Sequence, residues 1–189
     1  NIGTNEAQLS NVSIIGNSGI DTFVYTSAAL TDGTANAKLV GSGGNDILQI
    51  TGNTSVGNAN LAGFSGMNTI NLSSYTGSIS LGSNATTMGL TTIDASGNTG
   101  TLSIDASAMN SSVTINATNA NGSTYKGSSV AGDILNINNA LTSQDASSIT
   151  GIETINVNAN TTFTGDLTGV TNLTIVSGKT LNVDASAVS

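Results

Sequence analysis

The sequence predicts an all-β chain, a right-handed parallel β-helix (β-solenoid) with coils of about 20–25 residues. The first observation is an eleven-residue repeat from Thr92 to Thr124, where TIDASGNTGTL, SIDASAMNSSV and TINATNANGST follow one another. The second is a longer unit, rich in Gly and Asp, that recurs near the N-terminus at an offset of 25 residues. The third is composition, because periodic aliphatic residues without proline suit a narrow stacked core.

The first coils are expected in residues 11–51. NVSIIGNSGIDTFVYT aligns without gaps on NAKLVGSGGNDILQIT, and each copy reads as a strand, a Gly-rich turn with one Asp, and a second strand. The expected strands are Val12–Ile15, Thr22–Tyr25, Lys38–Val40 and Ile47–Ile50. Residues 27–35, which include Asp32 and Gly33, are expected to form the return loop.

The later coils are expected in residues 61–189, so that residues 1–189 form one solenoid segment of a longer protein. They are marked by an apolar residue and a following Thr-Ile, as in FSGMNTIN, MGLTTID, ITGIETIN and VTNLTIV. The isoleucines of these motifs are expected to point into the core: Ile70, Ile93, Ile155 and Ile175. Two eleven-residue blocks make one coil of 22 residues, with Ile93, Ile104 and Ile115 turned inward.

Little helix is expected in this chain. Residues 27–30 and 141–149 are each expected to hold a short turn at most. Asn residues are expected to stack their amides on the equivalent amide one coil away. Disorder is the competing interpretation, because polar low-complexity chains often bury too little surface to fold. The periodic aliphatic residues and the absence of proline favour the folded alternative.

Charge and composition narrow the partners. Eleven acidic residues face three lysines, with no arginine or histidine, and the net charge is −8. Phosphates are neutralised by Lys and Arg, so no nucleic acid partner is expected, whereas divalent cations are favoured. There is no apolar run long enough to span a bilayer, so no membrane insertion is expected. The lack of cysteine excludes disulfides and thiolate metal sites.

The Gly/Asp turns are the candidate metal site. Glycines allow carbonyl oxygens to converge in a tight turn, and one carboxylate per turn supplies the charge that Ca²⁺ prefers. The predicted calcium-binding residues are Gly16, Asn17, Gly19, Asp21, Gly41, Gly43, Gly44 and Asp46, with Asp133 as a further candidate in GSSVAGDILNIN. On this interpretation Asp21 and Asp46 lie on adjacent coils and share an ion. The alternative is a plain Gly/Asx turn without metal.

Four aspartates occur in D-A-S or D-A contexts, at Asp94, Asp105, Asp145 and Asp184. Paired carboxylates of a polysaccharide-cleaving enzyme are one interpretation, and turn caps are the other. Recurrence with the coil favours caps, and without His, Cys or a nucleotide-binding motif the chain is not expected to be an enzyme. The rows of Thr92, Ser103 and Thr114 suggest an ice-binding face, although β-propensity alone selects the same residues.

The Gly/Asp turns resemble the calcium-binding nonapeptide G-G-x-G-x-D-x-U-x of the RTX family, with Asn17 or Ser42 in place of the second glycine. The copies here are 25 residues apart, whereas the family runs them in tandem at nine. With the TINV and TIDAS segments, the TLNVDASA close and the acidic, Cys-free composition, the chain resembles RTX-type surface-layer proteins of Gram-negative bacteria.

This resemblance implies a structural role. The chain would be secreted by the type I route, lie outside the cell on the bacterial surface, bind Ca²⁺ and self-assemble into a lattice with copies of itself. Cell-surface polysaccharide would be a further partner, bound through another region. The first alternative is the stalk or repeat region of a secreted RTX adhesin, and the second is a polysaccharide-active β-helix enzyme.

Overall fold

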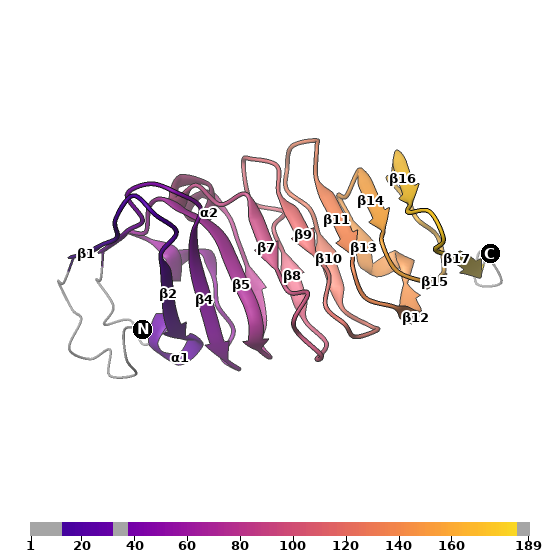
Figure 1. Cartoon of the computed structure of the whole chain (residues 1–189), viewed down its shortest axis with the longest axis horizontal. Coiled ribbons are helices and arrows are strands. Elements are labelled where there is room, and N and C mark those ends of the chain that lie inside the picture. The colour runs from indigo at the N-terminus through magenta and orange to yellow at the C-terminus, as the bar shows by residue number, and fades with distance from the viewer. Residues whose placement is uncertain (1–12, 32–37, 185–189) are drawn as a thin grey trace.

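The computed structural model describes residues 13–31 and 38–184, and β-strands are its main elements. The predicted features at Val12, Asp32 and Gly33 lie outside these residues. The strands lie side by side along the long axis of the molecule (Figure 1). They are β1 (Ser13–Ile15), β2 (Thr22–Thr26), β3 (Lys38–Val40), β4 (Asp46–Gly52), β5 (Met67–Tyr75), β6 (Ser78–Ser80), β7 (Thr92–Asp94), β8 (Ser103–Asp105), β9 (Thr114–Asn116), β10 (Thr124–Lys126), β11 (Ile134–Ile137), β12 (Leu141–Asp145), β13 (Ile149–Thr150), β14 (Thr154–Val157), β15 (Thr161–Thr164), β16 (Asn172–Ile175) and β17 (Leu181–Asp184).

Every pairing between these strands is parallel. The largest sheet has eight strands in the order β2-β4-β5-β7-β9-β11-β14-β16, and smaller sheets are formed by β6-β8-β10-β13, β12-β15-β17 and β1-β3. Partners in the largest sheet are 20 to 25 residues apart, as in Leu135 with Ile155 and Phe23 with Leu48. The predicted all-β chain with parallel strands at this spacing is therefore confirmed.

The eleven-residue blocks alternate between two sheets. Ile93 pairs with Ile115 in the eight-stranded sheet, whereas Ile104 lies in the four-stranded sheet between Ile79 and Tyr125. Ile93, Ile104 and Ile115 are all completely buried. The prediction that two blocks make one 22-residue repeat is confirmed.

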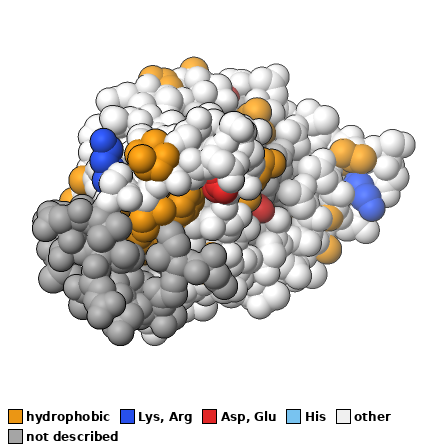
Figure 2. Space-filling view, turned by 60° about the vertical axis from the view of Figure 1, so that its left-hand side comes forward, with side chains coloured by type: hydrophobic (Ala, Val, Ile, Leu, Met, Phe, Trp, Pro, Cys, Tyr) orange, Lys and Arg blue, Asp and Glu red, His pale blue; other side chains and the backbone are white. Residues whose placement is uncertain are grey.

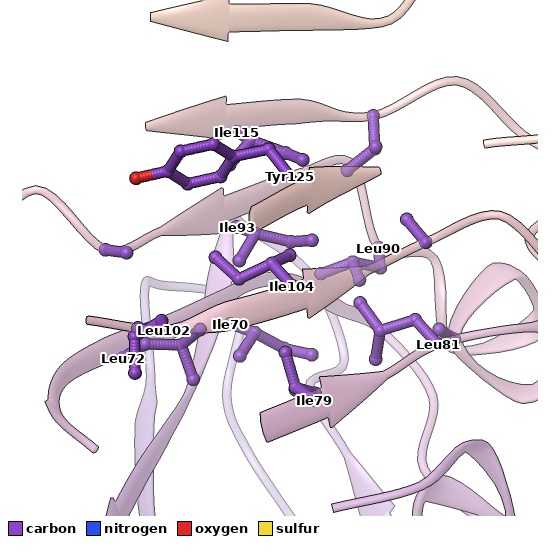
Figure 3. Close-up of a cluster of buried hydrophobic side chains, with 14 of the residues drawn as sticks. Ile70, Leu72, Ile79, Leu81, Leu90, Ile93, Leu102, Ile104, Ile115 and Tyr125 are labelled. Atoms are coloured by element: carbon purple, nitrogen blue, oxygen red, sulfur yellow. The ribbon is translucent and has the colours of Figure 1, made fainter. Parts of the chain in front are cut away.

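The core is the narrow layer between these facing sheets. Figure 3 shows Ile70, Ile93 and Ile115 from one sheet opposite Ile79 and Ile104 from the other. Each of these side chains is at most 1% exposed. Because side chains alternate between the two faces of a strand, one aliphatic residue per strand is enough to fill this layer.

Four short helical segments interrupt the strands: α1 (Ser27–Thr31), η2 (Asn58–Leu61), α2 (Ser83–Met88) and η3 (Ala146–Ser148). The expected turn at residues 27–30 corresponds to α1, and the expected turn at 141–149 is instead β12 followed by η3. Helix α2 was not predicted. Its first N–H groups are capped from outside the segment, since Asn84 and Ala85 donate to Oδ1 of Asn58 at 2.9 and 3.3 Å. No helix of the described residues is long and apolar enough to cross a membrane.

The C-terminal end of the stack differs from the prediction. Ile70, Ile93 and Ile155 are fully buried as expected, but Ile175 is 45% exposed. It also lies in a different column, because Leu173 is the partner of Ile155. The motif around Ile175 is one residue shorter than the other copies, and β16 has a neighbour on one side only among the described strands. Both differences follow from its position in the last strand of the sheet.

Candidate functional site: the Gly/Asp turns

The structure places eight of the predicted metal-binding residues in two neighbouring turns. Gly16, Asn17, Gly19 and Asp21 connect β1 to β2, whereas Gly41, Gly43 and Gly44 lead from β3 to Asp46 at the start of β4. The two turns are adjacent because β1 pairs with β3 and β2 with β4. Asp133 begins the same kind of connection before β11, four strands further along the sheet. We call residues 16–21, 41–46 and 127–133 the Gly/Asp turns.

The aspartates of these turns accept hydrogen bonds from the preceding repeat. The backbone N–H of Asp21 donates to Oδ1 of Asp46 at 2.8 Å, and that of Val113 donates to Oδ1 of Asp133 at 2.6 Å. These pairs are 25 and 20 residues apart in the chain. Each carboxylate therefore supplies an acceptor to a backbone donor at the start of a neighbouring strand.

The second carboxylate oxygen acts within its own turn. Oδ2 of Asp21 accepts the backbone N–H of Asn17 at 2.7 Å, and Oδ2 of Asp133 accepts the N–H and the hydroxyl of Ser128 at 2.6 and 2.9 Å. Asp46 is different, because its Oδ2 is buried and has no hydrogen-bond partner in the structure. Ser42, which stands where Asn17 does, has a left-handed backbone with φ of 74°.

The first glycine of each turn is required by space. A Cβ atom on Gly41 would lie 2.1 Å from Oδ2 of Asp46 and 2.4 Å from the carbonyl oxygen of Gly66. The same arrangement recurs at Gly16, against Asp21 and Gly41, and at Gly127, against Asp133 and Gly151. A carboxylate oxygen and a carbonyl oxygen of the next repeat thus pack against one glycine Cα three times.

Two further residues belong to the same row and were not predicted. Asn68 accepts the N–H of Asp46 through Oδ1 at 3.3 Å, and Glu153 accepts the N–H of Asp133 through Oε2 at 2.9 Å. Their signal in the sequence was the Gly-x-Asn-Thr-Ile and Gly-x-Glu-Thr-Ile segments, in which the polar residue precedes the strand as Asp46 does. Asn68, however, lies beside a register shift between β4 and β5, which hides the correspondence.

The D-A-S aspartates are local caps. Oδ1 of Asp94, Asp105 and Asp145 accepts the backbone N–H and the hydroxyl of the serine two residues later, at distances of 2.5 to 3.1 Å. We call residues 94–96, 105–107 and 145–147 the D-A-S turns. Asp94 and Asp105 end strands of different sheets. Residues 13–31 and 38–184 contain no group of three or more Asp, Glu, His or Cys side chains arranged to hold a metal ion.

Asp105 also forms an ion pair with Lys126, with Oδ2 and Nζ 3.0 Å apart. Partial burial acts to raise the pKa of Asp105, but hydrogen bonds from Ser107 and the charge of Lys126 outweigh it, and the pKa lies below its ordinary value. Burial raises the pKa of Tyr75, whose hydroxyl donates to the carbonyl oxygen of Thr54 at 3.0 Å.

Comparison with known proteins adds no assignment to this geometry. No protein-family model, no curated protein sequence and no solved structure matches the chain.

Proposed function

We propose that the chain is a right-handed β-solenoid segment of an RTX-type bacterial surface-layer protein that self-assembles outside the cell. The single observation that carries this proposal is the row of cross-repeat caps at the start of the eight-stranded sheet. Each Gly/Asp turn accepts a backbone N–H from a neighbouring repeat, so the repeats are joined by side chains as well as by strand pairing. Such a stack is a stiff rod with nearest-neighbour contacts, which suits a structural coat.

The last strands of the rod supply a surface for self-association. Leu173, Ile175 and Val183 on β16 and β17 are 42%, 45% and 50% exposed. Unpaired strand edges with exposed apolar side chains favour pairing with another chain. Lattice neighbours of the same sequence are the proposed partners, as for the surface-layer proteins that the sequence resembles.

Calcium is proposed at Asp46, and the structure offers a test of fit. Oδ2 of Asp46 is a buried carboxylate oxygen without a donor, and the carbonyl oxygen of Gly66 packs against the same Gly41 Cα. Oxygen ligands of this kind suit Ca²⁺, and the ion would supply positive charge to a buried carboxylate. Asp21 adds a carboxylate one repeat away, whereas Asp133 already accepts three hydrogen bonds. We therefore restrict the proposed ion to the two N-terminal turns.

The test compares thermal unfolding and assembly of the chain in EDTA and in millimolar CaCl₂. The melting temperature and the extent of ordered assembly are expected to rise with calcium, because an ion that binds only the folded state stabilises it. Asp46→Asn is expected to remove the response, and Asp145→Asn, in a D-A-S turn, is expected to keep it. Equal melting and assembly of the unaltered chain in both buffers would exclude the calcium proposal.

A further inference from the structure

The outer face of the eight-stranded sheet carries two straight columns of polar residues. From β5 to β16 the strands pair without any register shift, so equivalent side chains lie directly beside one another. These residues alternate with buried ones and therefore point away from the core. We call the two columns the Thr/Asn face: Thr69, Thr92, Thr114, Ile134, Thr154 and Asn172 in the first, and Asn71, Asp94, Asn116, Asn136, Asn156 and Thr174 in the second.

The second column is held in place by its own hydrogen bonds. Nδ2 of Asn156 donates to Oδ1 of Asn136 at 2.9 Å, and Nδ2 of Asn136 donates to Oδ1 of Asn116 at 2.9 Å. Asn116 continues the row to Oδ1 of Asp94 at 3.4 Å. An amide has two N–H donors and two acceptor lone pairs, so each ladder amide keeps polar capacity for solvent. The face thus presents ordered donors and acceptors at the strand spacing of about 4.8 Å.

Charge gives this face no electrostatic partner. Asp94 is the single charged residue among its twelve, although the chain as a whole has a net charge of −8. The space-filling view likewise shows few charged side chains on the side that it presents (Figure 2). A neutral partner that forms hydrogen bonds is therefore the one that matches.

Area argues against a protein as that partner. Six strands at the usual spacing give a face about 24 Å long and roughly 300 Å² in area, well below the ~800 Å² per partner of a stable protein interface. A protein would also strip water from the hydroxyls and amides, which costs free energy wherever the new hydrogen bonds are imperfect. A partner made of water requires no such stripping.

We propose that the Thr/Asn face binds ice. Ice is neutral and periodic, and it accepts and donates hydrogen bonds across its whole surface. Water molecules held in rows by the threonine hydroxyls and the asparagine amides would join the lattice, while the threonine methyl groups lie between them. This activity is independent of the proposed surface-layer role, because it uses the outer face of the sheet and neither the Gly/Asp turns nor the end strands.

The experiment measures thermal hysteresis and ice-crystal shaping by the 189-residue chain at up to millimolar concentration. Thr114→Tyr places a bulky ring in the middle of the first column and is expected to abolish most of the hysteresis. The matched control is Thr124→Tyr, which makes the same change at an outward position of the four-stranded sheet and is expected to retain it. Circular dichroism and melting temperature show that both variants are folded.

Three outcomes would overturn the proposal. The first is a chain without hysteresis or crystal shaping at millimolar concentration. The second is an equal effect of the two tyrosine substitutions, which would place any activity elsewhere. The third is self-association in analytical ultracentrifugation that Thr114→Tyr abolishes without any hysteresis in the unaltered chain, which would assign the face to a second copy.

Discussion

The Gly/Asp turns and the D-A-S turns use the same residue for different purposes. Asp133, in a Gly/Asp turn, is completely buried and accepts a hydrogen bond from Val113 in the preceding repeat. Asp145, in a D-A-S turn, is exposed and caps Ser147 two residues away. Gly/Asp turns lead into strands of the eight-stranded sheet, whereas D-A-S turns follow strands of three sheets.

This comparison separates contacts within a repeat from contacts between repeats. A local Asx cap forms whenever the turn forms, so it adds little to the cooperativity of the stack. A cross-repeat cap exists only when two repeats are correctly aligned. We therefore expect the Gly/Asp turns to set the register between repeats and the D-A-S turns to shape single bends.

The largest expected difference concerns the glycines. Gly41→Ala should destabilise the chain by roughly 3 kcal/mol, because its Cβ would overlap a carboxylate oxygen and a backbone oxygen that have little room to move. Gly97→Ala, just after a D-A-S turn, meets only the side chain of Ser73 at 3.1 Å and should cost less than about 1 kcal/mol. Chemical denaturation of both variants measures the difference, and equal costs would remove the steric distinction between the turns.

A smaller difference is expected for the aspartates themselves. Asp133→Ala leaves the buried N–H of Val113 and the N–H of Ser128 without acceptors and should cost about 2–4 kcal/mol. Asp145→Ala removes an exposed cap and should cost about 1 kcal/mol. The comparison uses unfolding free energies at neutral pH, with Ser143→Ala, at an exposed position of the same strand as Asp145, as a neutral control. A cost for Asp145→Ala as large as that for Asp133→Ala would contradict the distinction.

The smallest effect is a pH dependence at Asp105. Its pKa is lowered in the folded chain, so its stabilising contribution is complete above the unfolded pKa of about 3.9 and is lost as the pH falls through the lower folded pKa. Asp105→Asn keeps the acceptor for Ser107 but loses the charge opposite Lys126. At pH 7 we expect a cost of a few tenths of a kcal/mol, since the pair is exposed.

This pH prediction is checked by denaturation of both proteins from pH 7 to pH 2. The stability difference between them should shrink towards the acid end of the range. A difference that stays constant across it would mean that the Lys126 charge is not the cause.

Much of the architecture was predictable from local patterns. The strand Lys38–Val40, the burial of Ile70, Ile93 and Ile155, and the adjacency of the two N-terminal Gly/Asp turns all agree with the structure. The amide ladder was also expected, and it is present from Asn116 onward. These features depend on residue type and spacing, which the chain repeats.

Other features could not be predicted in the same way. Asn68 and Glu153 act as cross-repeat caps although neither lies in a Gly/Asp turn, and helix α2 depends on Asn58, which is 26 residues before the donor in Asn84. Leu173 takes the column predicted for Ile175 because a motif lacks one residue. In each case the deciding contact joins residues that are far apart in the chain.

By itself, the sequence determined that the chain forms short parallel strands with a 20–25-residue spacing and which aliphatic residues are inward, because periodicity and turn residues act within one repeat. Only the tertiary structure decided which carboxylate reaches which neighbouring N–H, why Gly41 tolerates no side chain, and that the Thr/Asn face is continuous across six strands. These properties arise where two repeats meet, so they depend on the alignment of chain segments that no local rule relates.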